Sequence, residues 1–282
     1  MKKKIVIIVI LLAIALVLLF IPKSTYQKLF NKGDVDENNE LSYSLLVYLE
    51  DDLNRVVGVN VKVNELEEDE VRQKWNLLTV NSNMLPANFQ SSIPSNCELV
   101  DYKEEDNKLV LYTNAAIKDA NGRKALESIA WTFINDDIKE VCIFVNDEQI
   151  NCFKDYSFKK INKNQGINLE YETMYLYEST ATTLIYQQDE YILPVTYFHL
   201  ESDICDYIVM KTLDNLDFNT EVYDYQIEDS VLTLDFVDAS MLSLNQITTL
   251  VESIGFNLNV DCLNINNNEN IFYQRVFNEV EE

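Results

Sequence analysis

An internal repeat constrains the fold of this chain more than any other feature of its sequence. The segment NCELVDY at residues 96–102 corresponds to NTEVYDY at residues 219–225. The match continues at the same offset through three further pairs: Asp106 and Asp229, Leu109 and Leu232, Leu111 and Leu234. A fixed offset over so many positions indicates that one structural unit was duplicated, so the sequence predicts two copies of one domain. A duplicated module without catalytic residues in either copy favours binding or assembly over catalysis.

The first copy shows alternating and helical apolar patterns in turn. Apolar residues alternate through 45–49 and 57–63 around a polar turn, which predicts a hairpin with one solvent-exposed face. Charged, helix-forming residues over 65–76 predict a helix with Val71, Trp75 and Leu78 on one face. The remaining predicted elements are an extended loop between Pro86 and Pro94, a hairpin of 97–102 with 108–112, an amphipathic helix over 126–133 and a strand over 141–145.

The second copy repeats this order. The predicted elements are an opening strand pair of Tyr175–Tyr177 with Ile192–Leu200, a helix over 204–213, a hairpin of 221–225 with 231–236, a helix over 247–254 and a strand over 260–265. From Gln274 onward we expect a short helix or a frayed end. The pattern is typical of the α+β class, with helices packed on one face of a small mixed sheet in each copy.

These patterns divide the chain into six segments. The prediction is a transmembrane anchor at 1–22, a polar linker at 23–41, a first domain at 42–152, a second linker at 153–170, a second domain at 171–275 and a tail at 276–282. The two domains are called the first copy and the second copy below.

The N-terminus carries a hydrophobic segment long enough for a membrane. Three lysines precede an unbroken apolar run from Ile5 to Ile21, which ends at Pro22. A helix of about 17 residues spans on the order of 26 Å, close to the thickness of a thin hydrocarbon core. The lysines favour a cytoplasmic N-terminus, which places the rest of the chain outside the cell membrane. The alternative is a cleaved signal peptide, but small residues are lacking at the end of the run.

The overall charge limits the partners. A net charge of −25 argues against nucleic acids, anionic lipids and anionic wall polymers, because these partners require cations. It favours solubility or a basic protein partner. The five cysteines include Cys142 and Cys262, which fall in apolar runs at similar places in the two copies. We expect them to be small buried side chains, with no obligatory disulfide.

Two polar segments can each be interpreted either as a solvated linker or as a binding segment. Residues 34–42 resemble the start of a calcium loop, but Asn39 replaces the turn glycine and Leu45 the closing carboxylate, which favours a hydrated acidic linker. Residues 152–166 carry Lys154, Lys159, Lys160 and Lys163. This basic stretch is interpreted as an exposed linker or, alternatively, as a segment that docks against an acidic surface.

The first copy also resembles a known family. Residues 78–99, with Leu85-Pro86, Ile93-Pro94 and the segment SNCEL, are followed by a hairpin, an amphipathic helix and VCIFVND at 141–147. This order is similar to the GerMN domain family, whose members include tandem-domain sporulation and spore germination proteins. The resemblance covers roughly 45–152 and 172–273.

The resemblance implies a fold related to ring-building motifs, and a role in assembling or stabilising an envelope-spanning complex between mother cell and forespore. It implies no catalytic residues. The chain departs from the family at the last turn, where Asn146-Asp147 and Asn266-Asn267 replace a glycine, although asparagine tolerates the same left-handed backbone. No lipid-accepting cysteine follows the apolar run.

A search for catalytic motifs leads to the same conclusion. The single histidine, His199, lies in an apolar strand pattern without cysteine or acidic neighbours at zinc-ligand spacing. Nucleophile-elbow, zinc-protease and phosphate-loop motifs are absent from the sequence. The acidic pairs Asp51-Asp52, Glu104-Glu105 and Asp136-Asp137 fall at predicted turns, where acids are expected for solubility, although carboxylates can also pair in space in a hydrolase. We therefore predict no catalytic, cofactor-binding or metal-binding residues and no cofactor.

The sequence and the resemblance together lead to one function and two alternatives. The prediction is a non-enzymatic, single-pass, extracytoplasmic protein that supports an envelope or sporulation complex and binds no nucleic acid. The sequence leaves the oligomeric state undetermined, with an oligomer as one possibility. One alternative is an extracytoplasmic modulator of a membrane sensor kinase. The other is an ectodomain that binds wall fragments or small molecules, with a sugar groove formed by aromatic side chains such as Tyr43, Tyr48, Tyr171, Tyr175 and Tyr177.

Overall fold

The computed structural model describes residues 43–63, 69–80, 85–188, 191–214, 223–268 and 270–277. The predicted anchor at 1–22, the linker at 23–41 and the segment similar to a calcium loop lie outside the described residues. Among the helices that are described, none combines the length and the apolar character needed to cross a membrane.

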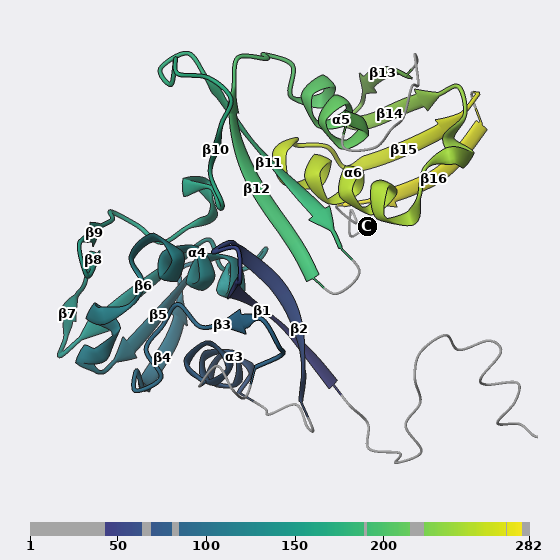
Figure 1. Cartoon of the computed structure of the whole chain (residues 1–282). Coiled ribbons are helices and arrows are strands. Elements are labelled where there is room, and N and C mark those ends of the chain that lie inside the picture. Colours follow the sequence, from purple (N-terminus) through teal and green to yellow (C-terminus); the bar gives the residue numbers. More distant parts are fainter. Residues whose placement is uncertain are drawn as a thin grey trace, which may run out of the picture. The chain divides into compact units, whose positions relative to one another are not determined.

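The first copy consists of a hairpin, two helices and a four-stranded sheet (Figure 1). Its elements are β1 (Tyr43–Asp51), β2 (Val56–Val63), α3 (Glu70–Thr79), β3 (Phe89–Gln90), β4 (Leu99–Glu105), β5 (Lys108–Thr113), the 3-10 helix η2 (Ala115–Asp119), α4 (Gly122–Phe133), β6 (Glu140–Val145) and β7 (Glu148–Gln149). The sheet has the order β4-β5-β6-β7, and its central pair, β5 and β6, is parallel. The segment that follows contains β8 (Cys152–Phe153), β9 (Tyr156–Ser157), the 3-10 helix η3 (Lys163–Gln165) and β10 (Glu170–Tyr171).

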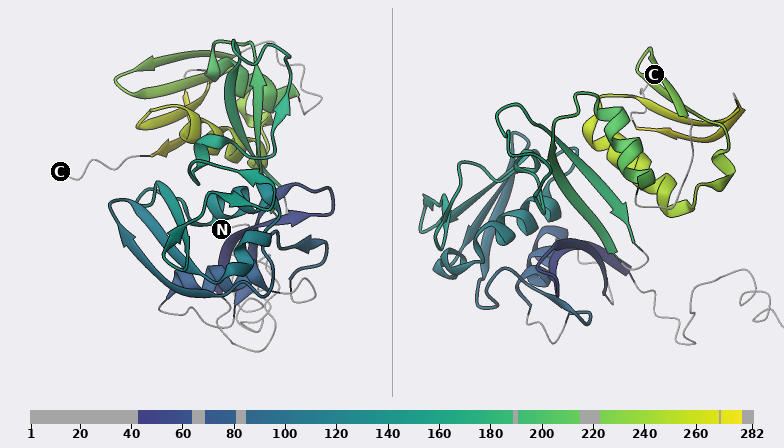
Figure 2. Two further views of the ribbon diagram at one scale, coloured as in Figure 1. Left: turned by 90° about the vertical axis from the view of Figure 1, so that its left-hand side faces the viewer. Right: turned by 45° about the horizontal axis from the view of Figure 1, so that its top comes forward.

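The second copy repeats this architecture. Its elements are β11 (Thr180–Gln187), β12 (Tyr191–His199), α5 (Ile204–Asp214), β13 (Tyr223–Glu228), β14 (Val231–Phe236), the 3-10 helix η4 (Ala239–Met241), α6 (Leu244–Asn257), β15 (Cys262–Asn267) and β16 (Asn270–Val276). Its sheet has the order β13-β14-β15-β16 and again a parallel central pair. Helices α5 and α6 cover one face of this sheet (Figures 1 and 2). The predicted α+β class, with equivalent helices and mixed sheets in both copies, is therefore confirmed.

The opening hairpins of the two copies join in one sheet, which the sequence did not predict. Strand β2 pairs antiparallel with β12 through Val59 with Tyr191 and Gly58 with Ile192. The resulting six-stranded sheet contains β1, β2, β3, β10, β11 and β12. Because β2 and β12 are the second strands of equivalent hairpins, the two copies meet through the same edge, as subunits do in a two-fold dimer.

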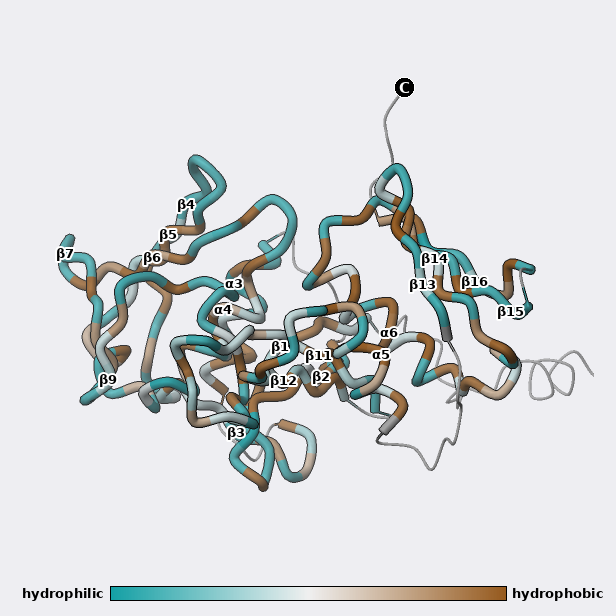
Figure 3. Tube along the Cα trace, turned by 90° about the horizontal axis from the view of Figure 1, so that it is seen from above, coloured by the Kyte–Doolittle hydropathy of each residue, from teal (hydrophilic) through white to brown (hydrophobic). Residues whose placement is uncertain are grey.

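The two copies keep separate apolar clusters, with one exception. The cluster of the second copy lies between its two helices and its four-stranded sheet. The cluster of the first copy also includes Leu193 and Val195, which come from β12 of the second copy. Hydrophobic stretches along β1, β2 and β12 mark this region (Figure 3). The interiors are therefore equivalent but joined at the shared sheet.

The first hairpin is buried more fully than its alternating pattern predicts. Residues 47–51 and 56–59 are all buried, so the expectation of one solvent-exposed face is wrong near the turn. Here β12 extends the sheet, and α3 and α4 pack against β1. The Tyr48 ring covers Gly58 opposite it, because a Cβ atom at Gly58 would lie 2.9 Å from Tyr48 Cζ.

Helix α4 is buried all round, although its sequence predicts only an apolar stripe. Every residue from 125 to 133 is buried. Three polar side chains in this stretch have partners inside: Glu127 binds Arg123, Ser128 bonds to Ser92, and the Thr132 hydroxyl accepts from the Tyr48 N–H. Buried polar groups of this kind are stable only when they are hydrogen-bonded.

Helix α6 uses a polar stripe to satisfy the outer edge of β11. Three of its side chains accept hydrogen bonds from alternate backbone N–H groups of that strand: Asn257 from Thr183 at 2.9 Å, Ser253 from Ile185 at 2.9 Å and Thr249 from Gln187 at 3.2 Å. An open strand edge invites pairing with another chain, so this helix protects the edge. Thr132 of α4 does the same for β1 at one position.

The turns follow the backbone preferences of their residues. Asp106 and Asn107 have φ of 50° and 59°, and Asn146 and Asp147 have φ of 51° and 64°, so the predicted left-handed turn without glycine is confirmed in the first copy. The corresponding prediction for Asn266-Asn267 is wrong. Both residues belong to β15, and Asn268 with φ 48° carries the left-handed conformation because β15 pairs further along with β16.

Three other boundaries differ from the prediction. Helix α3 begins at Glu70, where the Asp69 side chain caps it by accepting from the Arg72 N–H, and it continues to Thr79; residues 65–68 of the predicted helix lie outside the described residues. Residues 175–177 form no strand; the opening strand is Thr180–Gln187, whose Thr-rich sequence pairs along β12. Residues 274–276 lie in β16 and not in a helix, since the β15 edge offers them a ladder of hydrogen bonds; residues from 278 onward lie outside the described residues.

Candidate functional site

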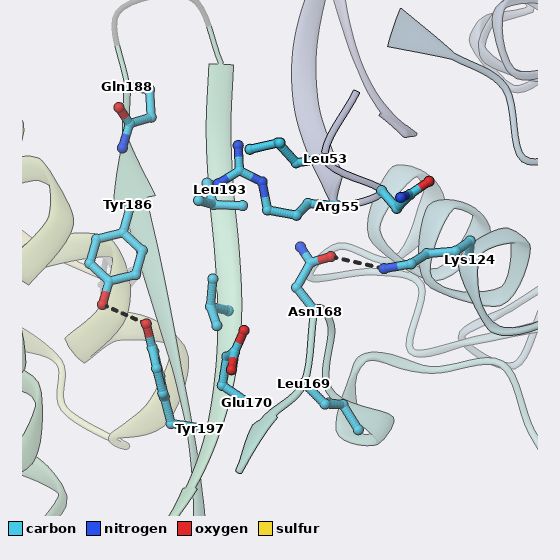
Figure 4. Close-up of a pocket in the computed structure, with 12 residues that line it drawn as sticks. Leu53, Arg55, Lys124, Asn168, Leu169, Glu170, Tyr186, Gln188, Leu193 and Tyr197 are labelled. Carbon is cyan, nitrogen blue, oxygen red and sulfur yellow. Dashed lines mark hydrogen bonds between the residues drawn. The ribbon is translucent and has the colours of Figure 1, made fainter. Parts of the chain in front are cut away.

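A cavity lies beside the junction of the two hairpins (Figure 4). Its volume is about 710 Å³. It is lined by residues of the β1–β2 turn, the start of α4, the segment before β10, and strands β11 and β12: Leu53, Asn54, Arg55, Lys124, Asn168, Leu169, Glu170, Tyr186, Gln188, Leu193, Val195 and Tyr197. Four separate parts of the sequence therefore build one site.

Asn168 ties these parts together at the base of the cavity. Its side-chain oxygen accepts from the Val56 N–H at 2.8 Å. Its amide nitrogen donates to the Val56 carbonyl at 2.7 Å and to the Pro194 carbonyl at 2.8 Å. Pro194 has no N–H to donate, so β2 and β12 cannot continue their ladder here, and the Asn168 amide takes the place of a peptide group between them. Asn168 has φ 45°, a left-handed conformation that asparagine tolerates.

Two cations border this part of the cavity. Arg55 binds the buried carboxylate of Asp51 through Nε at 2.8 Å and Nη2 at 2.7 Å. Lys124 Nζ lies 3.3 Å from Asn168 Oδ1 and 3.6 Å from Glu127 Oε2. Both side chains remain about a third exposed or less, at 32% and 27%. Both guanidinium donors contact one oxygen, Asp51 Oδ2, and this charge-assisted pair ties the Arg55 side chain to the β1–β2 turn.

The opposite wall is aromatic and polar. The phenols of Tyr186 and Tyr197 share a hydrogen bond of 3.1 Å (Figure 4). Leu193 and Val195 form an apolar strip on β12 between them and the cations, and Glu170 contributes a carboxylate. The cavity thus combines cations, phenols, an acid and an apolar surface, which is the composition of a binding site.

The aromatic residues named as a sugar groove do not meet. Tyr48 is buried against Trp131, with ring centroids 5.6 Å apart. Tyr171 stacks on Phe198, and Tyr175 and Tyr177 are exposed on the segment before β11. None of these residues lines the cavity; Tyr186 and Tyr197 do. Tyr186 and Tyr197 lie on neighbouring strands of one hairpin, so a correct prediction of β11 would have indicated that these two side chains share a site.

His199 is held inside the protein by a hydrogen bond and by ring stacking. It is buried, its Nε2 lies 2.8 Å from Thr182 Oγ1, and its ring stacks on Tyr207 with centroids 3.5 Å apart. Burial lowers the pKa of the imidazole, although Glu172 acts in the opposite direction. The Tyr207 hydroxyl donates to Glu172, which also binds Lys211. Across the described parts of the chain, no cluster of three histidine, cysteine or acidic residues has the spacing for a metal ion.

The acidic pairs at turns divide into two kinds. Glu104, Glu105 and the pair at 136–137 are exposed, as expected for solubility, but Glu104 and Glu105 lie at the end of β4 and the turn itself is Asp106-Asn107. Asp51 is buried, and its Oδ1 accepts from the N–H groups of Leu53 and Arg55 at 3.0 and 2.7 Å. The solubility interpretation is therefore wrong for Asp51, which closes the β1–β2 turn.

The basic segment is not an exposed linker. Phe153, Ile161 and Ile167 are fully buried in the first cluster. Lys160 binds Glu140 at 2.9 Å, and Lys163 Nζ lies 4.9 Å from the centre of the Trp131 ring. The exposed-linker interpretation fails because three apolar residues spread along this segment pack against the first copy.

Lys163 gives the first testable prediction. Burial lowers the pKa of its amine to about 8, against the weaker effect of Asp136. Above that value the folded protein has released a proton that unfolded lysine still binds, so the free energy of unfolding rises with pH up to the ordinary lysine value. The stability gap between Lys163→Met and the parent protein is expected to change by about 1 kcal/mol between about pH 7.5 and about pH 9 in favour of the parent.

Urea unfolding of both proteins over this range measures the gap. Lys159→Met, at an exposed position of the same segment, is the control and should show a constant gap. The ionisation of cysteines and tyrosines is common to all three proteins and cancels. A gap for Lys163→Met that does not change with pH contradicts the prediction.

The cysteines are all free thiols, and Cys97, Cys142 and Cys205 are buried. Burial raises the pKa of Cys97 and of Cys205 to about 12. Cys142 and Cys262 were predicted to occupy similar buried places in the two copies, but Cys262 is only partly buried and the two positions are not equivalent. The strand registers align Cys142 with Asn264, two residues beyond Cys262 on the equivalent strand.

The architecture defines a class: a tandem pair of small α+β modules, each with an opening hairpin, two helices and a mixed four-stranded sheet. Among solved structures, the chain is similar to the tandem GerMN domains of the sporulation protein GerM from Bacillus subtilis, with a TM-score of 0.68 and 20% sequence identity. The similarity covers 81% of this chain and 92% of that one. The fold is therefore that of tandem GerMN domains, as the resemblance in sequence implied.

A second match has a narrower extent. The first GerMN domain of the same Bacillus subtilis protein matches with a TM-score of 0.38 and 16% identity, covering 43% of this chain and 98% of that one. No family model matches the sequence. No curated protein matches it either.

Proposed function

We propose that this chain is a membrane-anchored, extracytoplasmic, non-enzymatic protein that supports the assembly or stability of an envelope-spanning complex in sporulation or germination. The observation that carries the proposal is the similarity to the tandem GerMN domains of a sporulation protein over nearly the whole length of that structure. The apolar run at residues 5–21, preceded by lysines, supports an anchor with the N-terminus in the cytoplasm.

The described surface offers a contact region for such a role. Met174, Tyr175, Leu176 and Tyr177 are exposed one after another between β10 and β11. Hydrogen bonds within the segment hold it, including that from the Glu178 N–H to the Tyr175 carbonyl. Tyrosine and methionine are enriched at the centres of protein interfaces, so this segment is the first place to look for a partner.

Site-specific cross-linking in the organism of origin tests the proposal. A photoreactive residue at Tyr177 is expected to capture a defined envelope protein in sporulating cells and to capture it less in growing cells. A photoreactive residue at Asp136, which is exposed on the first copy, is the matched control. External protease should remove the described domains from intact protoplasts if they lie outside the membrane.

Three outcomes contradict the proposal. These are protection of the domains in intact protoplasts, the same cross-linked product at both positions, and a membrane sensor kinase as the captured neighbour. The last outcome would favour the regulatory alternative.

A further inference from the structure

The cavity at the hairpin junction has a fixed frame. Its base is the Asn168 side chain, which makes three hydrogen bonds of 2.7–2.8 Å to buried backbone groups of β2 and β12. The Asp51 carboxylate holds the Arg55 side chain at one rim. With a volume of about 710 Å³, the cavity lies in the range of small-molecule sites, roughly 300–1,000 Å³. It is therefore large enough for a ligand and built from elements that do not need to move.

The charges of the cavity run against those of the protein. The chain carries a net charge of −25, yet Arg55 and Lys124 both border the same part of the cavity. The nearest acids are buried and have bound cations: Asp51 binds Arg55 itself, and Glu127 binds both Arg123 and Lys124. Arg55 is paired with Asp51, whereas Glu127 is shared between two cations, so the Lys124 ammonium is the group at the cavity wall suited to a carboxylate, which the surrounding acidic surface would otherwise repel.

The rest of the lining defines the neutral part of a ligand. Glu170 accepts hydrogen bonds, Tyr186 and Tyr197 present hydroxyls, and Gln188 presents an amide (Figure 4). These groups match hydroxyls and amides, while the strip of Leu193 and Val195 matches the apolar side of a ring. Glu170 also disfavours a second negative charge at its end of the cavity.

We propose that this cavity binds a small hydroxylated carboxylic acid, of which an acidic sugar is the simplest form. The carboxylate lies against Lys124, and the hydroxyl or amide groups face Glu170, Tyr186 and Gln188. This site is separate from the assembly role proposed above, and either can fail without the other.

Calorimetric titration of the full chain in detergent micelles tests the site. The probe is N-acetylmuramic acid, and N-acetylglucosamine is the matched probe without the carboxylate. The parent protein is expected to bind the first probe at least about tenfold more tightly than the second, as loss of a charge-assisted contact requires. N-acetylglucosamine 6-phosphate is the third probe and distinguishes a phosphate from a carboxylate.

The variants locate the binding. Lys124→Met is expected to weaken binding of N-acetylmuramic acid about tenfold, and Lys124→Arg to retain it, because arginine keeps the cation. Lys118→Met, at an exposed position outside the cavity, is the control and should bind as the parent does. Tyr186→Phe removes one hydroxyl from the opposite wall and is expected to weaken binding several-fold. Thermal unfolding followed by circular dichroism confirms that each variant is folded.

Several results overturn the proposal. They are no heat of binding with N-acetylmuramic acid, equal affinity for N-acetylglucosamine, and tighter binding of the phosphorylated sugar. Equal loss in the Lys118 and Lys124 variants would also overturn it. If Lys124→Met fails to fold, Tyr186→Phe with unchanged affinity is sufficient to reject the site.

Discussion

Replacing Asn168 with alanine is expected to lower the free energy of unfolding by about 4 kcal/mol. The substitution removes the partners of the Val56 N–H, the Val56 carbonyl and the Pro194 carbonyl, all of which lie in the buried junction of the two hairpins. An unpaired buried backbone group costs about 1–3 kcal/mol, and β2 and β12 cannot pair with each other here because Pro194 has no N–H. Urea unfolding followed by circular dichroism measures the change.

Asn54→Ala is the matched control for backbone strain. Asn54 also has a positive φ, 57°, but its side chain is exposed. Alanine in the left-handed region costs about 1–2 kcal/mol, so Asn54→Ala reports strain without the lost hydrogen bonds. If both variants lose the same stability, the Asn168 amide has no role beyond its backbone conformation, and the bridging interpretation is wrong.

Replacing Trp131 with alanine is expected to cost about 4 kcal/mol, in the range measured for buried aromatic residues. The Trp131 side chain is 5% exposed and lies between Tyr48 of the first copy and Phe256 of the second. Its ring stacks on Phe256 with centroids 5.3 Å apart and an interplanar angle of 22°. The substitution therefore removes core packing and a contact between the copies in one step.

A double-mutant cycle separates these two losses. Trp131→Ala and Phe256→Ala are expected to couple by about 1 kcal/mol, as aromatic pairs do. Trp75→Ala, which removes the other buried tryptophan, provides the control, since Trp75 packs on Phe133 within the first copy. Its losses should add to those of Phe256→Ala within about 0.5 kcal/mol. Additive losses for Trp131 and Phe256 would show that their stacking does not join the copies.

Periodicity in the sequence predicted the elements that bury one face. Ile247, Leu250, Val251 and Ile254 recur at helical spacing and lie in α6, and the stripe of Ile204, Ile208, Val209 and Leu213 lies in α5. In both helices the apolar stripe packs on the four-stranded sheet of the second copy, while α6 turns a separate polar stripe toward β11. Left-handed turns were predictable in the same local way, as at Asn146-Asp147, because the conformation belongs to the residue itself.

Periodicity failed where an element is covered from several sides. Helix α4 contains Glu127, Ser128 and Thr132 among its buried residues, and each is satisfied by a group far away in sequence or on the next turn. The residues of 175–177 are apolar but exposed, while the threonines of β11 form the strand. Apolar character alone did not distinguish these cases, because hydrogen-bond partners from other elements decided them.

The candidate site was not predictable from the sequence. Arg55, Lys124, Asn168 and Tyr186 lie in four separate segments, and each has an ordinary local role as a turn, helix, loop or strand residue. Nothing in their spacing relates them. The sequence identified other aromatic residues and other acids, which the structure places apart.

The sequence by itself determined the duplication, the α+β class and the order of elements in each copy, because hydrophobic periodicity and turn chemistry are local properties of a chain. Only the tertiary structure decided that β2 pairs with β12, that Asn168 fills the gap at Pro194, and that Arg55 and Lys124 both line one cavity. These features depend on which strand edges and side chains from distant segments find one another, and that choice is set by packing and by the need to satisfy buried polar groups.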